Sequence, residues 1–173
     1  PADVLLVSRC AQLLDGGRVP HQVDPCEIQQ LWELAAGEND PDAQQAMGLW
    51  CARMRLDGGR TAAGAGSANF RKAIRWLTLA GEQGRAQAWY ALSRIYIKPE
   101  FSQRNVGIAQ RYLEQAAGMG YRAAQLECGN NAWRARRENE DSDVRALYWL
   151  RLAAAQGCPA ARAALRKIAP RVA

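Results

Sequence analysis

The stretch AIRWLTLAGEQGRAQA at residues 73–88 joins the end of one amphipathic helix to the start of another. The spacing i, i+3, i+4 and i+7 of a buried helical stripe is occupied by Ala73, Trp76, Leu77 and Ala80. Gly84 then interrupts the pattern, and small residues resume at Ala88. A helix, a glycine turn and a second helix are therefore predicted within a single short stretch.

The same pattern occurs twice more along the chain. It returns as AQRYLEQAAGMGYRAA at 109–124 and as ALYWLRLAAAQGCPAA at 146–161. The aromatic and leucine positions hold Tyr112-Leu113 and Trp149-Leu150, and the glycine position holds Gly120 and Gly157. Successive copies begin 36 and 37 residues apart, at Ala73, Ala109 and Ala146. Self-similarity at such a fixed period indicates a repeat protein.

Each copy consists of two helices, which we call the Trp–Leu helix and the Leu–Gly helix. Each Leu–Gly helix has an alanine followed, four and five residues later, by a characteristic pair. Ala43 is followed by Met47-Gly48, Ala88 by Leu92-Ser93 and Ala124 by Cys128-Gly129. Small residues at fixed positions predict close crossings between neighbouring helices. Gly84, Gly120 and Gly157 are predicted to end the Trp–Leu helices with positive φ, which glycine adopts without steric cost.

Helix-start signals agree with this division. Proline at the first helical position is predicted after Asp24 and Asp40, and N-caps are predicted at Asn69, at Asn105 and at Ser142 or Asp143. No stretch alternates between polar and apolar residues as a strand would. The chain is therefore expected to be all-α.

A two-helix unit of this length and pattern resembles the Sel-one-like (Sel1-like) repeat family, whose members are relatives of the tetratricopeptide repeat. The resemblance covers about residues 25–169 and implies a right-handed α–α superhelix, a solenoid of antiparallel pairs with about eight or nine helices. We expect a capping helix at 1–20 and a repeat domain at 25–173. The expected units are 28–72 (degenerate), 73–108, 109–145 and 146–169.

The resemblance implies an adaptor that binds another protein in an extended groove, often in bacterial signalling, envelope or secretion systems. The residues expected to face this groove are Gln45, Leu49, Arg53, Tyr90, Arg94, Ile97, Lys98, Leu126, Asn130, Trp133, Arg134 and Arg166. The set is cationic and aromatic and contains no carboxylate, which favours an acidic or amphipathic partner segment. The alternative, that the arginines are merely solvated and Trp133 belongs to the core, stays open.

Nucleic-acid binding is the second functional hypothesis. The chain carries 23 Lys and Arg against 17 Asp and Glu, a net charge of +6. Aromatic platforms beside a basic track bind single strands, and the groove set could provide both. Against this hypothesis, lysine occurs only at Lys72, Lys98 and Lys167, and no base-reading pattern recurs in the repeats. We therefore expect a protein partner rather than a nucleic acid.

Catalysis, cofactors and metals find no support in the sequence. His21 is the only histidine, and no glycine-rich phosphate-binding motif occurs. The five cysteines contain no CxxC pair, so they are predicted to be reduced and to act as small core residues. A disulfide bond between Cys10 and Cys26 is the alternative.

The sequence contains no apolar run of about 18 residues, so no membrane span is expected. We expect a cytoplasmic protein; a periplasmic or secreted one is the alternative if a targeting segment has been removed. The oligomeric state is left open by the sequence.

Overall fold

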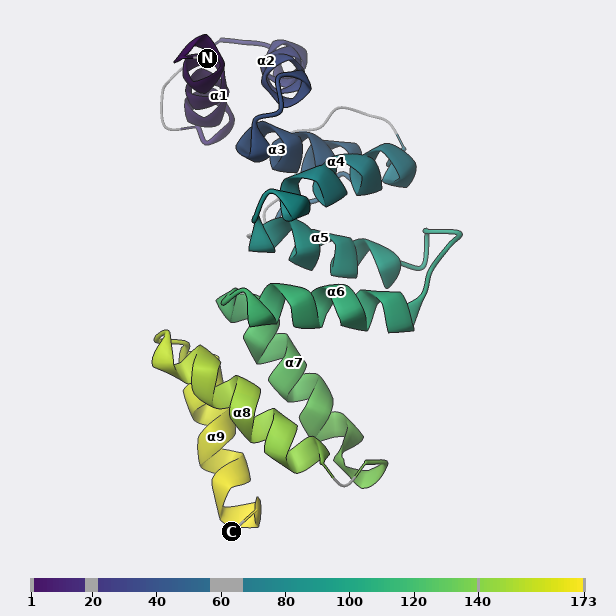
Figure 1. Cartoon of the computed structure of the whole chain (residues 1–173), viewed down its shortest axis with the longest axis vertical. Helices are drawn as coiled ribbons and strands as arrows, with labels where there is room; N and C mark the ends of the chain where they lie inside the picture. The colour runs from purple at the N-terminus through teal and green to yellow at the C-terminus, as the bar shows by residue number, and fades with distance from the viewer. Residues whose placement is uncertain (1, 18–21, 57–66, 140, 173) are drawn as a thin grey trace. The chain divides into compact units, whose positions relative to one another are not determined.

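The structure, a computed structural model, describes residues 2–17, 22–56, 67–139 and 141–172, and all regular secondary structure in these ranges is helical (Figure 1). The α-helices of the described residues are α1 (Ala2–Asp15), α2 (Pro25–Gly37), α3 (Pro41–Cys51), α4 (Phe70–Glu82), α5 (Ala86–Tyr96), α6 (Val106–Gly118), α7 (Arg122–Arg134), α8 (Ser142–Ala155) and α9 (Pro159–Val172). A short 3₁₀ helix, Ala135–Arg137, follows α7. These nine helices confirm the all-α prediction for the part of the chain that the structure describes.

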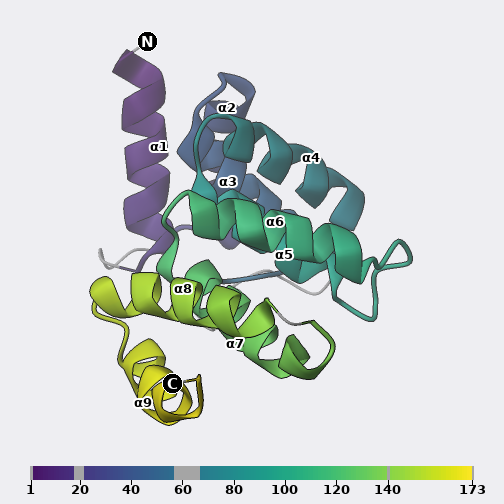
Figure 2. The same ribbon diagram turned by 60° about the horizontal axis from the view of Figure 1, so that its bottom comes forward.

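The helices form two compact units, Pro1–Arg104 and Asn105–Ala173. In the N-terminal unit each helix from α1 to α5 packs against the next, and in the C-terminal unit the same holds from α6 to α9 (Figures 1 and 2). The Leu–Gly helices are α3, α5, α7 and α9, and the Trp–Leu helices are α4, α6 and α8. Each unit is thus a stack of helix pairs, as the repeats predict.

Four of the five helix starts named from the sequence carry a side-chain cap. Side-chain oxygens of Asp24, Asp40, Asn69 and Asn105 accept hydrogen bonds from backbone N–H groups at 2.8, 2.8, 3.1 and 3.0 Å. The prediction is wrong for α8, where Ser142 is instead the buried first helical residue. The preceding Asp141 has helical φ and ψ and makes no side-chain cap bond, because capping oxygens are aimed by an extended backbone.

The predicted glycine turns are confirmed. Gly84, Gly120 and Gly157 have φ of 93°, 92° and 81°. The degenerate first copy has Asn39 at the same place, with φ of 68°. In each case this residue and the next donate backbone hydrogen bonds to carbonyls of the last helical turn, as in a Schellman motif. Every copy therefore ends its first helix in the same way, with or without glycine.

Two glycines only two residues apart allow a matched test of this turn. We expect Gly120→Ala to lower the free energy of unfolding by about 1 kcal/mol, because a Cβ atom strains the left-handed conformation. Gly118→Ala should leave stability unchanged or raise it, because Gly118 ends α6 and no atom lies within 4 Å of an added Cβ. Urea unfolding of both variants measures the difference. Equal stabilities would contradict the assigned turn.

The helices cross closely where the sequence places small residues. A Cβ atom added at Gly48 on α3 would lie 2.4 Å from Cγ of Leu77 on α4. A Cβ added at Gly129 on α7 would lie 2.6 Å from Cγ of Leu150 on α8. Both leucines are fully buried, so the missing side chain at each glycine makes room for the next helix.

The three aromatic residues of the Trp–Leu helices occupy similar environments but are only half-buried: Trp76, Tyr112 and Trp149. The sequence places Trp76 on the buried stripe, and that expectation is too strong because all three rings are only partly enclosed. The leucine that follows each aromatic residue is the deeply buried one: Leu77, Leu113 and Leu150. The core runs along the leucine and alanine side of these helices, and the aromatic rings lie at its edge.

A glutamine link joins neighbouring copies within each unit, and the sequence patterns did not reveal it. Gln83 Nε2 donates to Oε1 of the buried Gln44 at 2.7 Å and to the Asn39 carbonyl at 3.2 Å. In the C-terminal unit Gln156 Nε2 makes the equivalent bonds, to Gln125 Oε1 at 2.8 Å and to the Gly120 carbonyl at 2.9 Å. Buried amides are costly unless paired, so these links fix the register between the two copies.

Candidate functional site

A recess in the N-terminal unit collects most of the predicted groove residues of that unit. It lies between the end of α3 and the last turns of α5 and has a volume of about 550 Å³. We call it the cationic hollow. The described residues that line it are Arg53, Met54, Arg55, Leu56, Tyr90, Arg94, Ile97, Lys98 and Pro99. Five of the groove residues that the repeat pattern predicts are thus brought together.

The charged residues in the described lining of the cationic hollow are all basic. Three arginines and Lys98 line it, and no acidic residue occurs among its described lining residues. Tyr90 adds a half-buried aromatic ring. Like charges gathered in a recess with protein walls focus the electric field and attract ligands of opposite sign. The hollow is therefore suited to carboxylates or other anions.

Arg53 is held in an unusual backbone conformation at the rim of this hollow. Its φ is 53°, in the left-handed region that favours glycine. Its N–H donates to the Trp50 carbonyl at 3.1 Å, and the N–H of Met54 donates to the Leu49 carbonyl at 3.0 Å. These bonds form a Schellman motif that ends α3 and turns the chain along the hollow. A large cationic side chain occupies a position where glycine would be less strained.

The remaining two predicted residues of this unit, Gln45 and Leu49, line a neighbouring recess of about 360 Å³. We call it the tryptophan hollow. Its described lining residues are Gln12, Asp15, Trp32, Asp42, Gln45, Ala46, Leu49, Trp50, Met54, Arg55, Leu56 and Gln87. Its apolar lining residues come from α2, α3 and the segment after α3, and its polar lining residues come from α1, α3, α5 and Arg55. The two hollows differ in chemistry although they are adjacent.

Two polar atoms of residues lining the tryptophan hollow are buried without a partner among the described residues. They are Nε1 of Trp32, a side chain that is only 5% exposed, and Oε1 of Gln45. Gln45 uses its other amide atom, because Nε2 donates to Gln87 Oε1 at 2.8 Å. Most buried polar groups in proteins are hydrogen-bonded, so this donor and this acceptor are exceptions among the described residues.

In the C-terminal unit the predicted groove residues divide between packing and exposure. Leu126 and Trp133 pack against the core cluster around Leu150. Arg136 covers the Trp133 ring at 4.2 Å and donates from Nη1 to the Trp133 carbonyl at 2.8 Å. Trp133 therefore has a structural role, the alternative that the sequence left open.

The other predicted residues of this unit are less enclosed. Asn130 is half-buried on α7, and Arg134 is exposed at the end of that helix. Arg166 on α9 is exposed as well, but it occupies the repeat position of Gly48 and Gly129, not that of the other groove residues. We leave Arg166 out of the proposed site for this reason.

Several lining residues were missed by the repeat pattern. Met54, Arg55 and Leu56 follow the end of α3, and Trp32 belongs to the degenerate first copy. The sequence does contain a signal for the position of the site, because basic residues recur at the ends of the Leu–Gly helices, at Arg53, Lys98 and Arg134. It contains none for the path of the segment after Arg53, which is why Met54, Arg55 and Leu56 were missed.

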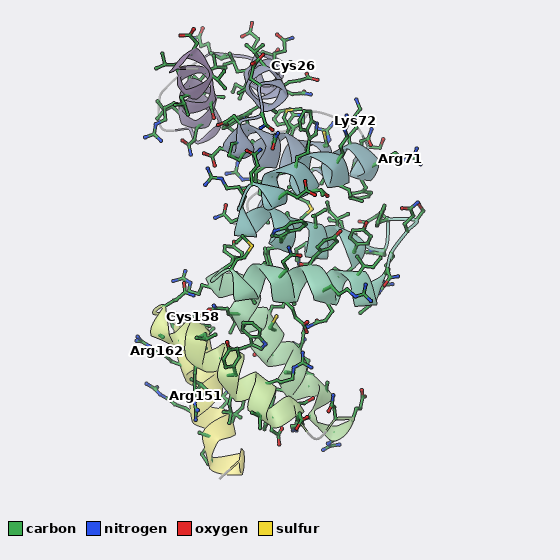
Figure 3. The ribbon with its side chains drawn as sticks, in the orientation of Figure 1. Cys26, Arg71, Lys72, Arg151, Cys158 and Arg162 are labelled. Atoms are coloured by element: carbon green, nitrogen blue, oxygen red, sulfur yellow. The ribbon has the colours of Figure 1, made fainter. Side chains whose placement is uncertain are left out.

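All five cysteines are free thiols. Cys128 and Cys158 are buried, as predicted for small core residues, and Cys51 is half-buried. The prediction is wrong for Cys10 and Cys26, which are exposed (Cys26 is labelled in Figure 3) and do not form the alternative disulfide bond. Cys10 lies off the buried side of α1, which is formed by Val4, Val7, Ala11 and Leu14.

Burial raises the pKa of the Cys128 thiol from 9.0 to about 12, and the carboxylates of Glu114 and Glu127 add to the effect. This thiol therefore stays protonated at neutral pH and lacks the thiolate that a nucleophile or metal ligand needs. The described residues contain no cluster of three or more His, Cys, Asp or Glu that could hold a metal ion. His21 and residues 57–66, a stretch rich in glycine, lie outside the described residues.

Within the described ranges, every helix is too short or too polar to cross a membrane.

Comparison with known proteins identifies the fold. No family model matches the sequence, and no curated protein matches it either. Among solved structures, the chain is similar to a Sel1 repeat protein from Oxalobacter formigenes, with 25% identity and a TM-score of 0.76. It is also similar, with 25% identity and a TM-score of 0.75, to a protective antigen with an SLR fold that is present in uropathogenic Escherichia coli strains.

These alignments cover 95% and 91% of this chain but only 63% and 32% of the two solved chains. Folds of this kind are generally non-catalytic scaffolds that mediate protein interactions. The repeated sequence, the helix pairs and the two structural likenesses lead to one conclusion: the chain is a helical repeat protein with the Sel1-like repeat fold.

Proposed function

We propose that the chain is a protein-interaction scaffold whose N-terminal unit binds an acidic segment of a partner protein in the cationic hollow. The observation that carries this proposal is the gathering of Arg53, Arg94 and Lys98 around one recess with Tyr90. Arginine and tyrosine are enriched among the residues that dominate binding energy at interfaces. Carboxylates of a partner would be steered to this recess, and added salt would weaken the encounter.

The conformation of Arg53 supports the same site. Residues held in sparsely populated φ/ψ regions tend to cluster at functional sites, where the strain is offset by what the side chain does. Arg53 has this property and lines the cationic hollow. On α7, Asn130 and Arg134 offer the C-terminal unit a further contact, because an amide side chain can both donate to and accept from a peptide main chain.

We also infer a bacterial origin, because both similar structures come from bacteria. A cytoplasmic location fits the exposed free thiols of Cys10 and Cys26, which would be prone to oxidation in an oxidising compartment.

The decisive experiment is capture of partner proteins from an extract of the native host. The variant Arg94→Glu/Lys98→Glu should reduce capture roughly tenfold or more, because it reverses two charges of the hollow. The matched control is Arg71→Glu, at the exposed start of α4 in the same unit (Figure 3). A carboxylate is favourable in the first turn of a helix, so the control should fold and bind normally.

Thermal melting of all three proteins keeps the outcome interpretable, since Arg94 is exposed and Lys98 half-buried. Capture that is equal for wild type and the double variant would refute the proposal. Capture that disappears after nuclease treatment would replace it with the nucleic-acid hypothesis.

A further inference from the structure

Helix α8 in the C-terminal unit exposes two large apolar side chains one turn apart. Val144 is 67% exposed and Tyr148 is 57% exposed. Together with Leu147 and Leu152 they line a recess of about 370 Å³, and Arg151 is the remaining residue of its described lining. Apolar side chains that gather in one exposed patch, unlike single ones, mark interaction sites.

The other repeat copies show that these two apolar side chains are not needed for the fold. Their repeat positions hold Arg71 and Arg75 on α4, and Gly107 and Arg111 on α6. All four of these residues are exposed. Only the copy that contains α8 therefore has apolar side chains where the two copies before it have arginine or glycine.

Charged residues flank the apolar pair on the same side of the helix. Asp141 lies three residues before Val144, and Arg151 lies three residues after Tyr148, which gives the alternating spacing of a helix–helix contact. We call these four residues the α8 stripe. Asp141 and Arg151 are exposed (Arg151 is labelled in Figure 3), and neither forms an ion pair with another described residue. The fully buried Ala146 lies on the opposite side of the helix.

The α8 stripe is complementary to itself. In an antiparallel pair of α8 helices, Val144 opposite Tyr148 of a second molecule also places Asp141 opposite Arg151 of that molecule. Twofold symmetry repeats each contact, so two apolar contacts lie between two ion pairs. A parallel pair would instead place like charges opposite one another, which is costly at an interface.

We propose that the α8 stripe is a homodimer interface, in which the α8 helices of two molecules pack antiparallel. Tyr148 of each molecule packs on Val144 of the other, and Asp141 pairs with Arg151 at both ends. A contact through one 14-residue helix is near the lower size limit of specific interfaces. We therefore expect a dissociation constant of about 10 µM.

Sedimentation velocity of the full chain between about 1 and 300 µM tests the association, because this range spans the expected constant. Val144→Arg/Tyr148→Arg should raise the dissociation constant about a hundredfold, since charges replace the apolar contacts. The new side chains are those that α4 carries at the same positions, Arg71 and Arg75, so circular dichroism should show an intact fold. Val144→Arg alone keeps the ring contact between Tyr148 and Trp149 and should weaken the dimer in the same direction.

Two charge variants test the direction of the helices. Asp141→Arg and Arg151→Asp should each weaken self-association roughly tenfold, because each places like charges opposite one another. An equimolar mixture of the two variants should associate as wild type does, because each end of the contact then joins an arginine to an aspartate again. Arg71→Glu, in the N-terminal unit, is the control that should dimerise normally.

A wild-type chain that stays monomeric over the whole range would overturn the inference, also if it binds anionic lipid vesicles or another protein through the α8 stripe. A dimer that survives Val144→Arg/Tyr148→Arg would overturn it as well, and so would a dimer that neither charge variant weakens. The proposed function is tested separately, because Arg94→Glu/Lys98→Glu alters the other unit and should leave the dimer intact.

Discussion

Gly129→Ala is expected to lower the free energy of unfolding by about 1–3 kcal/mol, although alanine is the better helix former. The added Cβ would lie 2.6 Å from Cγ and 2.9 Å from Cδ2 of Leu150, which is fully buried. Neither α7 nor the leucine can give way without opening the core of the C-terminal unit. Gly48→Ala should have the same effect on the N-terminal unit, against Leu77.

Gly118→Ala provides the matched control for both variants. It makes the same chemical change in a helix, but nothing lies within 4 Å of its added Cβ. For a chain of this size, each kcal/mol corresponds to a change in melting temperature of roughly 2–4 °C. Calorimetry should therefore separate the two crossing glycines from the control. Variants at Gly48 and Gly129 that melt like Gly118→Ala would mean that the helices do not cross as closely as described.

Arg53→Gly is expected to change stability and binding in opposite directions. Glycine relieves the strain of a left-handed conformation at φ of 53°, which should raise the free energy of unfolding by about 1 kcal/mol. The same change removes a guanidinium from the cationic hollow and should reduce capture of an acidic partner by roughly tenfold. A gain in melting temperature combined with a loss of binding is the expected result.

Arg53→Ala separates the two causes. Alanine lacks the charge but keeps a Cβ atom, so binding should fall as it does with glycine while the stability gain is absent. Thermal melting and partner capture of both variants complete the comparison. If Arg53→Gly binds as wild type does, the left-handed arginine has no part in recognition and the proposed site loses its best-defined residue.

The sequence predicted what repeats and missed what occurs once. Gly84, Gly120 and Gly157 could be assigned positive φ because three aligned copies demand the same turn. The first copy has Asn39 at that place, and asparagine tolerates the conformation well enough for the pattern to survive. Periodic signals of this kind come from local backbone geometry, which the sequence encodes directly.

The two hollows could not be predicted in the same way. Their shared wall, Met54 to Leu56, lies in the degenerate first unit but outside the pattern that repeats, and its path depends on tertiary packing. Trp133 illustrates the complementary problem: its repeat position is shared with no other aromatic residue, and only packing against the C-terminal core reveals its structural role. The groove prediction was therefore useful in the N-terminal unit, where five of its residues meet at one recess.

The glutamine link makes the order of the copies part of the information that the chain carries. Gln83 bonds the buried Gln44, but the copy that follows has Met119 at the place of Gln83, directly before Gly120. A recombination event that placed this later copy directly after the first one would leave Oε1 of Gln44 without its hydrogen-bond donor. The copies of this chain are therefore not interchangeable. A repeat unit can be gained or lost only where the glutamine–glutamine hydrogen bond between neighbouring copies is kept.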